Sequence, residues 1–227
     1  MTAYIMAMPT KTTAGTVEKF TNDAGKEIQK YEIEINGERL IDRTVRLLKN
    51  SLDEFDDIII GGYEKISGCD NYVTTAKGFE EHILDAVQHY GEDSIIILYG
   101  DCYYTEAFIN FAVEYQPSDW CHFCRMGYNP FTWKPWGEGY GFKICEKEGF
   151  IEKTETWLEL VRLGLVSNSN KWNWNRFMND ISNIYTHIES KPSPHDVIWD
   201  KDETDDFDYP RDVRLFKERM SINFGKE

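Results

Sequence analysis

The sequence has no apolar run near the roughly 20 residues that a membrane-spanning helix needs. It also lacks, near its start, the basic segment, apolar stretch and small-residue cleavage site that mark a secretory signal. We therefore expect a cytoplasmic protein without a membrane partner.

Positive charge is scarce as well. The chain has 25 Lys and Arg against 40 Asp and Glu, which gives a formal net charge of −15. A protein that binds a nucleic-acid backbone needs a basic surface, so we expect no nucleic-acid partner. Hydrophobic residues at 41% and aromatic residues at 15% indicate a globular protein. We expect the 227 residues to form one domain, residues 1–227.

Cysteine and histidine show no metal-binding pattern. The five cysteines have no framework spacing, which is typical of reduced thiols. "CHFC" from Cys121 to Cys124 is a lone pair without the second pair that a zinc site needs, and we interpret both as packed residues of a strand. His82 and His89 lie one heptad apart on a predicted helix, and we interpret them as partly buried side chains.

Continuous apolar runs alternate with amphipathic segments in the first half of the chain. The predicted strands are 3–8, 56–62 and 94–101, and the predicted helices are 40–50, 78–91 and 105–115. Strands of this kind are buried on both faces. The pattern predicts an α/β fold, a mainly parallel twisted sheet with helices on both faces.

The pattern is looser beyond Trp120. It predicts a strand at 120–126, a Gly- and Trp-rich turn leading into a strand, helices at 152–164, 172–183 and 210–220, and short strands at 184–190 and 205–208. We interpret residues 120–190 as a decoration of the same domain.

Asp101 is the most informative single residue, because it follows the third buried strand directly. Ligands of open α/β sheets bind outside the carboxyl ends of the strands. Gly100 would let the backbone approach such a ligand closely. The alternative is that Asp101 caps the helix predicted from Thr105.

The stretch "DETDDFDYPRD" concentrates acidic side chains before the last helix. In an extended chain Asp206 and Asp208 share one face, and Phe207 points to the other, into the core. Two carboxylates held together favour a cation, and Mg²⁺ takes one or two carboxylates plus substrate phosphates. A solvated acidic loop is the alternative. Pro210 suits the first helical position, and Asp212 suits a cap.

Three segments, in this order, resemble the nucleotidyltransferase superfamily with a GT-A-like, Rossmann-like fold. "KYEIEINGERLIDRTVRLLKN" is similar to its Lys-Pro-Leu and Asn-Gly-Lys-Pro-Leu-Ile region, "IIILYGDCYYTEAFI" to its Gly-Asp strand, and "DFDYPRDVRLF" to its Asp-Ile-Asp-Thr-Pro-Glu-Asp motif. The resemblance implies Mg²⁺-dependent joining of an NTP, with CTP or UTP favoured, to a small phosphorylated acceptor. It implies a sugar 1-phosphate or phosphocholine as acceptor, pyrophosphate as product, and a monomer or homodimer.

The resemblance also implies roles for individual residues. The metal ligands would be Asp101, Asp206 and Asp208, and the catalytic residues Asp101, Lys30 and Lys143. The nucleotide would be bound by Met8, Thr10, Lys11, Lys30 and Gly100. "KPWGEGYGFKI" is similar to a Trp-x-Glu-Pro-x-x-Phe-Lys segment of uncharacterised bacterial and phage members, which assigns the acceptor to Glu138 and Lys143 and makes residues 120–190 the acceptor side. A rival alignment assigns this role to Glu152 and Lys153.

The chain departs from the family after its first strand. The family has a glycine-rich loop there whose N–H groups bind the triphosphate, whereas this chain has "AMPTKTTAGTVEKF", with Pro9 at a glycine position. Two alternatives therefore stay open. One is a GT-A-type glycosyltransferase, although "DCY" lacks the second aspartate of its Asp-x-Asp motif, and the other is a nucleotide-binding protein without catalysis.

Overall fold

The computed structural model describes residues 1–7, 19–51, 55–62, 70–90, 94–125, 138–166, 174, 177–178, 195–200 and 202–224. Within them, the main sheet has seven strands in the order β10-β8-β9-β6-β1-β4-β5. These strands are β1 (Thr2–Ala7), β4 (Asp57–Gly62), β5 (Asp70–Val73), β6 (Ile95–Tyr99), β8 (Trp120–Arg125), β9 (Glu138–Ile144) and β10 (Asp196–Ile198).

Parallel pairing dominates the main sheet. β1 pairs in parallel with β4 and with β6, β4 with β5, and β8 with β10. β9 alone runs antiparallel to its neighbours, β6 and β8. The central strands β1 and β6 are apolar and buried, because helices cover the sheet on both sides. The predicted mainly parallel α/β fold is confirmed.

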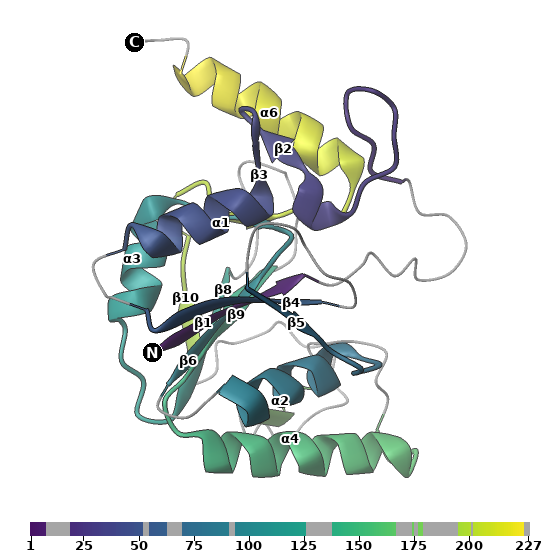
Figure 1. Cartoon of the computed structure of the whole chain (residues 1–227), viewed down its shortest axis with the longest axis vertical. Coiled ribbons are helices and arrows are strands. Elements are labelled where there is room, and N and C mark those ends of the chain that lie inside the picture. Colours follow the sequence, from purple (N-terminus) through teal and green to yellow (C-terminus); the bar gives the residue numbers. More distant parts are fainter. Residues whose placement is uncertain are drawn as a thin grey trace.

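Four helices form the outer layers (Figure 1). One face of the sheet carries α1 (Leu40–Lys49) and α3 (Glu106–Glu114), and the other carries α2 (Phe79–Tyr90) and α4 (Lys147–Arg162). In α1 the apolar residues recur at helical spacing and are buried, and this spacing is what made the helix predictable. No helix in the described ranges is both long enough and apolar enough to cross a membrane.

A smaller layer lies above α1, where the C-terminal helix α6 (Pro210–Phe224) packs beside a hairpin (Figure 1). The hairpin joins β2 (Glu34–Ile35) to β3 (Glu38–Arg39) through Asn36 and Gly37, whose φ angles are 53° and 79°. Both positive values belong to the tight turn that Asn-Gly favours. Before the hairpin comes a short 3-10 helix, η1 (Lys30–Glu32).

The second half of the chain differs most from the prediction. β8 and β9 lie inside the main sheet between β10 and β6, so residues 120–125 and 138–144 are strands of the sheet and not a decoration of it. β9 is the strand expected after the Gly- and Trp-rich turn, and Gly141 is required in it, because a Cβ would lie 2.1 Å from the carbonyl oxygen of Ile97. α4 begins at Lys147, five residues earlier than predicted.

The structure covers three late predictions to different extents. Trp174, Phe177 and Met178 are helical, and the rest of the predicted helix 172–183 lies outside the described residues. The predicted strand 184–190 lies outside them completely. The predicted strand 205–208 is shorter, because only β11 (Asp205–Asp206) is extended and paired.

The buried residue His82 generates a stability prediction. Its Nε2 lies 2.6 Å from the hydroxyl oxygen of Tyr4, and burial lowers its pKa to about 4. His82 therefore binds a proton below about pH 6.5 in the unfolded chain, but only near pH 4 in the folded chain. The free energy of unfolding therefore falls as the pH drops. This single group should cost about 3 kcal/mol between pH 7 and pH 4.

Denaturant unfolding across this pH range checks the expectation. The fall in unfolding free energy should shrink in His82→Gln and stay complete in His89→Gln, because His89 is exposed on the same helix. An equal fall in all three proteins would contradict the assignment.

Candidate active site

A short antiparallel pairing builds the site at the carboxyl end of β6. After Gly100 and Asp101 the chain forms β7 (Cys102–Tyr103), which pairs with β11 so that Cys102 faces Asp206. The backbone N–H of Phe207 also donates to the carbonyl oxygen of Asp101, at 3.4 Å. Two acidic segments that are a hundred residues apart in sequence therefore lie side by side.

Lys30 connects the two segments. Its Nζ lies 3.4 Å from Oδ2 of Asp101 and 3.5 Å from Oδ1 of Asp208. The side chains of Asp101 and Asp208 are 33% and 36% exposed, so both carboxylates remain accessible to a ligand, whereas that of Lys30 is only 15% exposed. The structure thus brings together three of the residues that the sequence singled out.

The charge of Lys30 is fixed by this environment. Burial by itself lowers the pKa of its ammonium group, but the nearby carboxylates of Asp101, Asp206 and Asp208 outweigh burial and raise the pKa above its ordinary value. A positive charge within reach of several carboxylates offsets their mutual repulsion. Lys30 is therefore the countercharge of the cluster in the folded protein.

Asp206 also belongs to a second, deeper group with Glu138 and Asp205. One carboxylate oxygen from each residue lies within 4.8 Å of the others, and all three residues are almost completely buried. Glu138 reaches this edge of the sheet because β9 runs antiparallel to β6. Asp205 was missed by the sequence reasoning, although it belongs to the same acidic run, because only the alternation of Asp206 and Asp208 was considered.

A buried arginine holds the acidic segment in place. Nη2 of Arg125, at the end of β8, donates to the carbonyl oxygens of Asp202 at 3.0 Å and Thr204 at 2.9 Å. Its Nε donates to the hydroxyl of Tyr140 at 2.9 Å, and that hydroxyl donates to the same carbonyl of Thr204, also at 2.9 Å. We call this arrangement the Arg125–Tyr140 clasp.

The residues that flank the acidic pair behave as predicted. Phe207 is buried against Phe216, with ring centroids 5.2 Å apart. α6 begins at Pro210, and Oδ2 of Asp212 accepts a hydrogen bond from the N–H of Tyr209 at 2.9 Å, so Asp212 caps the helix.

Asp101 does not cap the helix that follows it. Thr105 is the N-cap of α3, and its hydroxyl oxygen accepts from the N–H of Phe108 at 3.1 Å. The carboxylate of Asp101 instead lies beside Lys30. The alternative interpretation of Asp101 as a helix cap is therefore wrong.

Lys143 is not part of this group. It lies on β9 opposite Ile96 and Cys121, is fully buried, and donates from Nζ to the carbonyl oxygen of Val113 at 2.5 Å. Five residues of extended strand span about 16 Å, so Glu138 and Lys143 lie toward opposite ends of β9. Both residues were assigned to one acceptor from the resemblance to the Trp-x-Glu-Pro-x-x-Phe-Lys segment, which takes no account of the length of strand between them.

The rival pair belongs to α4. Lys153 donates to the carbonyl oxygen of Met178 at 3.2 Å and lies over the ring of Trp120, and Glu152 is exposed. Lys153 therefore takes part in the packing of a helix.

The predicted nucleotide contacts are described only in part. Met8, Thr10 and Lys11 lie outside the described residues. Gly100 donates its N–H to the carbonyl oxygen of Met6 at 2.9 Å, and a Cβ there would lie 3.0 Å from the same oxygen. The close approach of two backbone segments accounts for this glycine.

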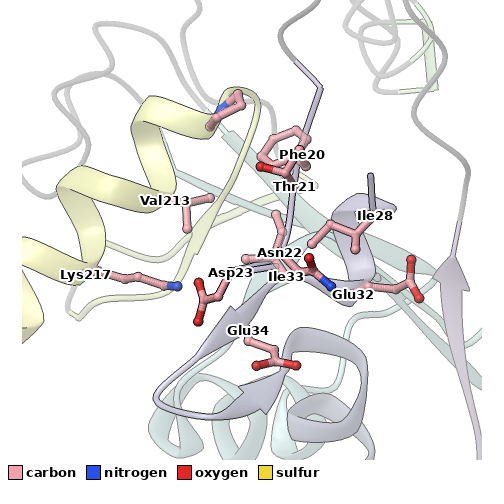
Figure 2. A pocket seen from close by; sticks show the side chains of 11 residues that line it. Phe20, Thr21, Asn22, Asp23, Ile28, Glu32, Ile33, Glu34, Val213 and Lys217 are labelled. Atoms are coloured by element: carbon pink, nitrogen blue, oxygen red, sulfur yellow. The ribbon is translucent and has the colours of Figure 1, made fainter. Parts of the chain in front are cut away.

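A separate pocket of about 110 Å³ lies between α6 and residues 20–34 (Figure 2). Its wall is apolar at Phe20, Ile28 and Val213, and Lys217 points toward Asp23 across it. None of the site residues predicted from the sequence lines this pocket, so it does not contribute to the assignment of the site.

Comparison with known proteins adds to this geometry. No protein-family model and no curated protein sequence matches the chain. Solved structures do match over nearly all of it. CMP:2-keto-3-deoxy-manno-octonic acid synthetase, solved with CTP, has a TM-score of 0.58 at 8% identity and covers 97% of this chain and 98% of its own.

Two further structures are similar. CTP:phosphocholine cytidylyltransferase from Streptococcus pneumoniae has a TM-score of 0.57 at 14% identity, covering 96% and 98% of the two chains. 2-C-methyl-D-erythritol 4-phosphate cytidylyltransferase from Thermus thermophilus has a TM-score of 0.56 at 8% identity, and the match covers 96% of this chain and 97% of that one. The chain shares their fold. At these identities the similarity concerns the fold alone, and it agrees with the predicted α/β fold with a mainly parallel sheet.

The Arg125–Tyr140 clasp generates a prediction about folding. Arg125→Met should lower the free energy of unfolding by roughly 2 to 5 kcal/mol, because buried carbonyl and hydroxyl groups lose their charged donor. Arg162→Met is the control, since that arginine pairs only with its helix neighbour Glu159 at an exposed site. Its change should stay within about 0.5 kcal/mol. Similar losses in both variants would show that the clasp does not hold the segment.

Proposed function

We propose that this protein is a nucleotidyltransferase that joins an NTP to a small phosphorylated acceptor and releases pyrophosphate. The observation that carries the proposal is the convergence of Asp101 and Asp208 on Lys30 at the carboxyl end of β6. This edge is where ligands bind in open α/β sheets, and the fold is shared with three solved enzymes whose names describe nucleotide transfer or activation with CTP or CMP.

The donor atoms at this edge fit magnesium. Asp101, Asp206 and Asp208 offer only carboxylate oxygens, which Mg²⁺ prefers. Asp206 also lies close to Glu138 and Asp205, and a nearby cation would relieve the repulsion between these carboxylates. We assign the metal to Asp101, Asp206 and Asp208. When bound, Mg²⁺ supplies charge neutralisation at the phosphates of the substrate.

The reaction is a substitution at phosphorus. A phosphate oxygen of the acceptor attacks the α-phosphorus of the NTP, a new P–O bond forms, and the bond between the α-phosphorus and the bridging oxygen breaks as pyrophosphate leaves. Lys30 is charged and lies at the carboxylates, so we assign it to the α-phosphate, where negative charge must be stabilised. No covalent enzyme intermediate is needed.

The remaining assignments extend the proposal around this centre. Met8, Thr10, Lys11 and Gly100 are proposed to contact the nucleotide, for which we favour CTP or UTP. Glu138 is proposed to face the acceptor, a sugar 1-phosphate or phosphocholine, because it lies buried beside Asp206 at the same edge.

A ligand panel tests the function directly. Thermal shift with CTP, UTP, GTP, ATP and dTTP in the presence of Mg²⁺ identifies the donor, and pyrophosphate release with sugar 1-phosphates and phosphocholine identifies the acceptor. Consumption of a nucleotide sugar without pyrophosphate would instead indicate a glycosyltransferase. Binding of an NTP without turnover would indicate a protein that binds nucleotide without catalysis.

The carboxylates should matter for rate more than for folding. Asp101→Asn and Asp208→Asn should each lower kcat for pyrophosphate release roughly a hundredfold or more, because the charge that holds the cation is reduced. Both side chains are partly exposed, so the melting temperature should change little. The control is Asp57→Asn, at the opposite end of the parallel strands, which should retain full activity. Full activity in Asp101→Asn would overturn the metal assignment.

Lys30 should affect both activity and the response to magnesium. Lys30→Met should lower kcat/KM at least about tenfold, because a charge at the phosphates is lost. It should also increase the rise in melting temperature that Mg²⁺ produces, since the carboxylates no longer have their protein countercharge. Lys49→Met, at the exposed end of α1, should match the wild type in both measurements. An unchanged magnesium response in Lys30→Met would separate Lys30 from the carboxylates.

A further inference from the structure

Three side chains with different ligand atoms meet at the edge pair of the main sheet, away from the acidic cluster. β8 and β10 pair in parallel with His122 opposite Asp196, and Cys124 follows two residues after His122 on the same face of β8. Nδ1 of His122 lies 3.2 Å from Oδ1 of Asp196. The sulfur of Cys124 completes a group in which the possible ligand atoms lie within 4.8 Å of one another.

The surroundings fix the backbone of this group. The N–H of His122 donates to the carbonyl oxygen of His195 at 2.9 Å, and the carbonyl oxygen of Cys124 accepts from the N–H of Trp199 at 2.8 Å. Gly139, on the neighbouring strand β9, leaves room for the imidazole, because a Cβ there would lie 3.0 Å from its Nε2. Backbone hydrogen bonds between the two strands therefore fix the positions from which the imidazole and the thiol extend.

The set of atoms is typical of a transition-metal site. Nitrogen, sulfur and carboxylate oxygen are the ligands that Zn²⁺ accepts, and three protein ligands leave a fourth position for water. Two ligands of one tetrahedral zinc lie about 3.3 Å apart, close to the distance between His122 and Asp196. The sulfur of Cys124 has to move up to about 1 Å closer to the other two ligand atoms to complete a tetrahedral zinc site.

An ion can reach the group from the side of Asp196. The side chain of Asp196 is 11% exposed, whereas that of His122 is 2% exposed and Cys124 is fully buried. The carboxylate thus lies at the entrance, and the thiol lies at the closed end.

We propose that His122, Cys124 and Asp196 form a binding site for a divalent transition metal that prefers thiolate and imidazole, with Zn²⁺ as the best match. This site is distinct from the magnesium ligands Asp101, Asp206 and Asp208, which offer only oxygen. The proposal does not rest on the proposed function, and it holds for a protein with any activity.

Cobalt(II) substitution tests the proposal on the full chain. Metal-free protein titrated with Co²⁺ should develop the near-ultraviolet thiolate-to-cobalt absorption band and saturate at about one ion per chain, and Zn²⁺ should remove the band. Cobalt bound at the acidic cluster gives no such band, because the ligands there are oxygens. The readout is therefore independent of catalysis.

Variants assign the band to its residues. Cys124→Ser should abolish it, and Asp196→Asn should weaken cobalt binding at least about tenfold. Cys121→Ser is the matched control, because Cys121 is a buried cysteine on the opposite face of the same strand, and it should keep the band. Asp196→Asn changes the most exposed ligand, so its melting temperature without metal should stay near that of the wild type.

Two results would overturn the proposal. One is the absence of a thiolate band in the wild type, which would leave His122 and Asp196 as a hydrogen-bonded pair only. The other is a band that persists in Cys124→Ser and disappears in Cys121→Ser, which would assign the thiolate to the other face of the sheet.

Discussion

The candidate site depends on the antiparallel pairing of β7 with β11. Asp101 is positioned by the buried strand β6, whereas Asp206 and Asp208 belong to a segment that is held at this edge by that pairing and by the Arg125–Tyr140 clasp. One main-chain pairing and one set of side-chain hydrogen bonds to main-chain carbonyls therefore bring together segments that are distant in sequence. The apolar core supports them from one side, since Phe207 is buried beneath the segment.

Charge balance explains why such a segment can be stable. Carboxylates held together repel, and the repulsion is strongest where burial excludes water. Lys30 offsets part of it for Asp101 and Asp208, and the opposing effects of burial and carboxylates on its pKa show that the carboxylates dominate. Lys30 therefore accounts for how Asp101 and Asp208 can lie close together in the folded chain.

The sequence was sufficient to predict the features of the fold that depend on a local residue pattern. Apolar runs and helical spacing predicted the parallel strands and their covering helices, and the rule on strand ends identified Asp101. The position of a residue along a strand of the sheet was harder to predict. β9 is rich in glycine, and Glu138 and Lys143 lie toward its opposite ends. Arg125 gave no local signal, since its partner Thr204 is distant in sequence, and the approach of Asp205 to Glu138 of β9 could not be read from the acidic run alone.

β8 links the features of the sheet because its residues alternate between two faces. Arg125 points to the face of Tyr140 and α3, where it carries the acidic segment, whereas Cys124, one residue earlier, belongs to the opposite face with His122. Between Phe123 and Cys124 the partner residue in β9 changes from Gly141 to Gly139, so Tyr140 is the extra residue of a bulge in β9. β-bulges next to active sites re-aim side chains in this way. β8 therefore contributes Arg125 to the clasp that holds the acidic segment and, on its other face, Cys124 to the proposed transition-metal site.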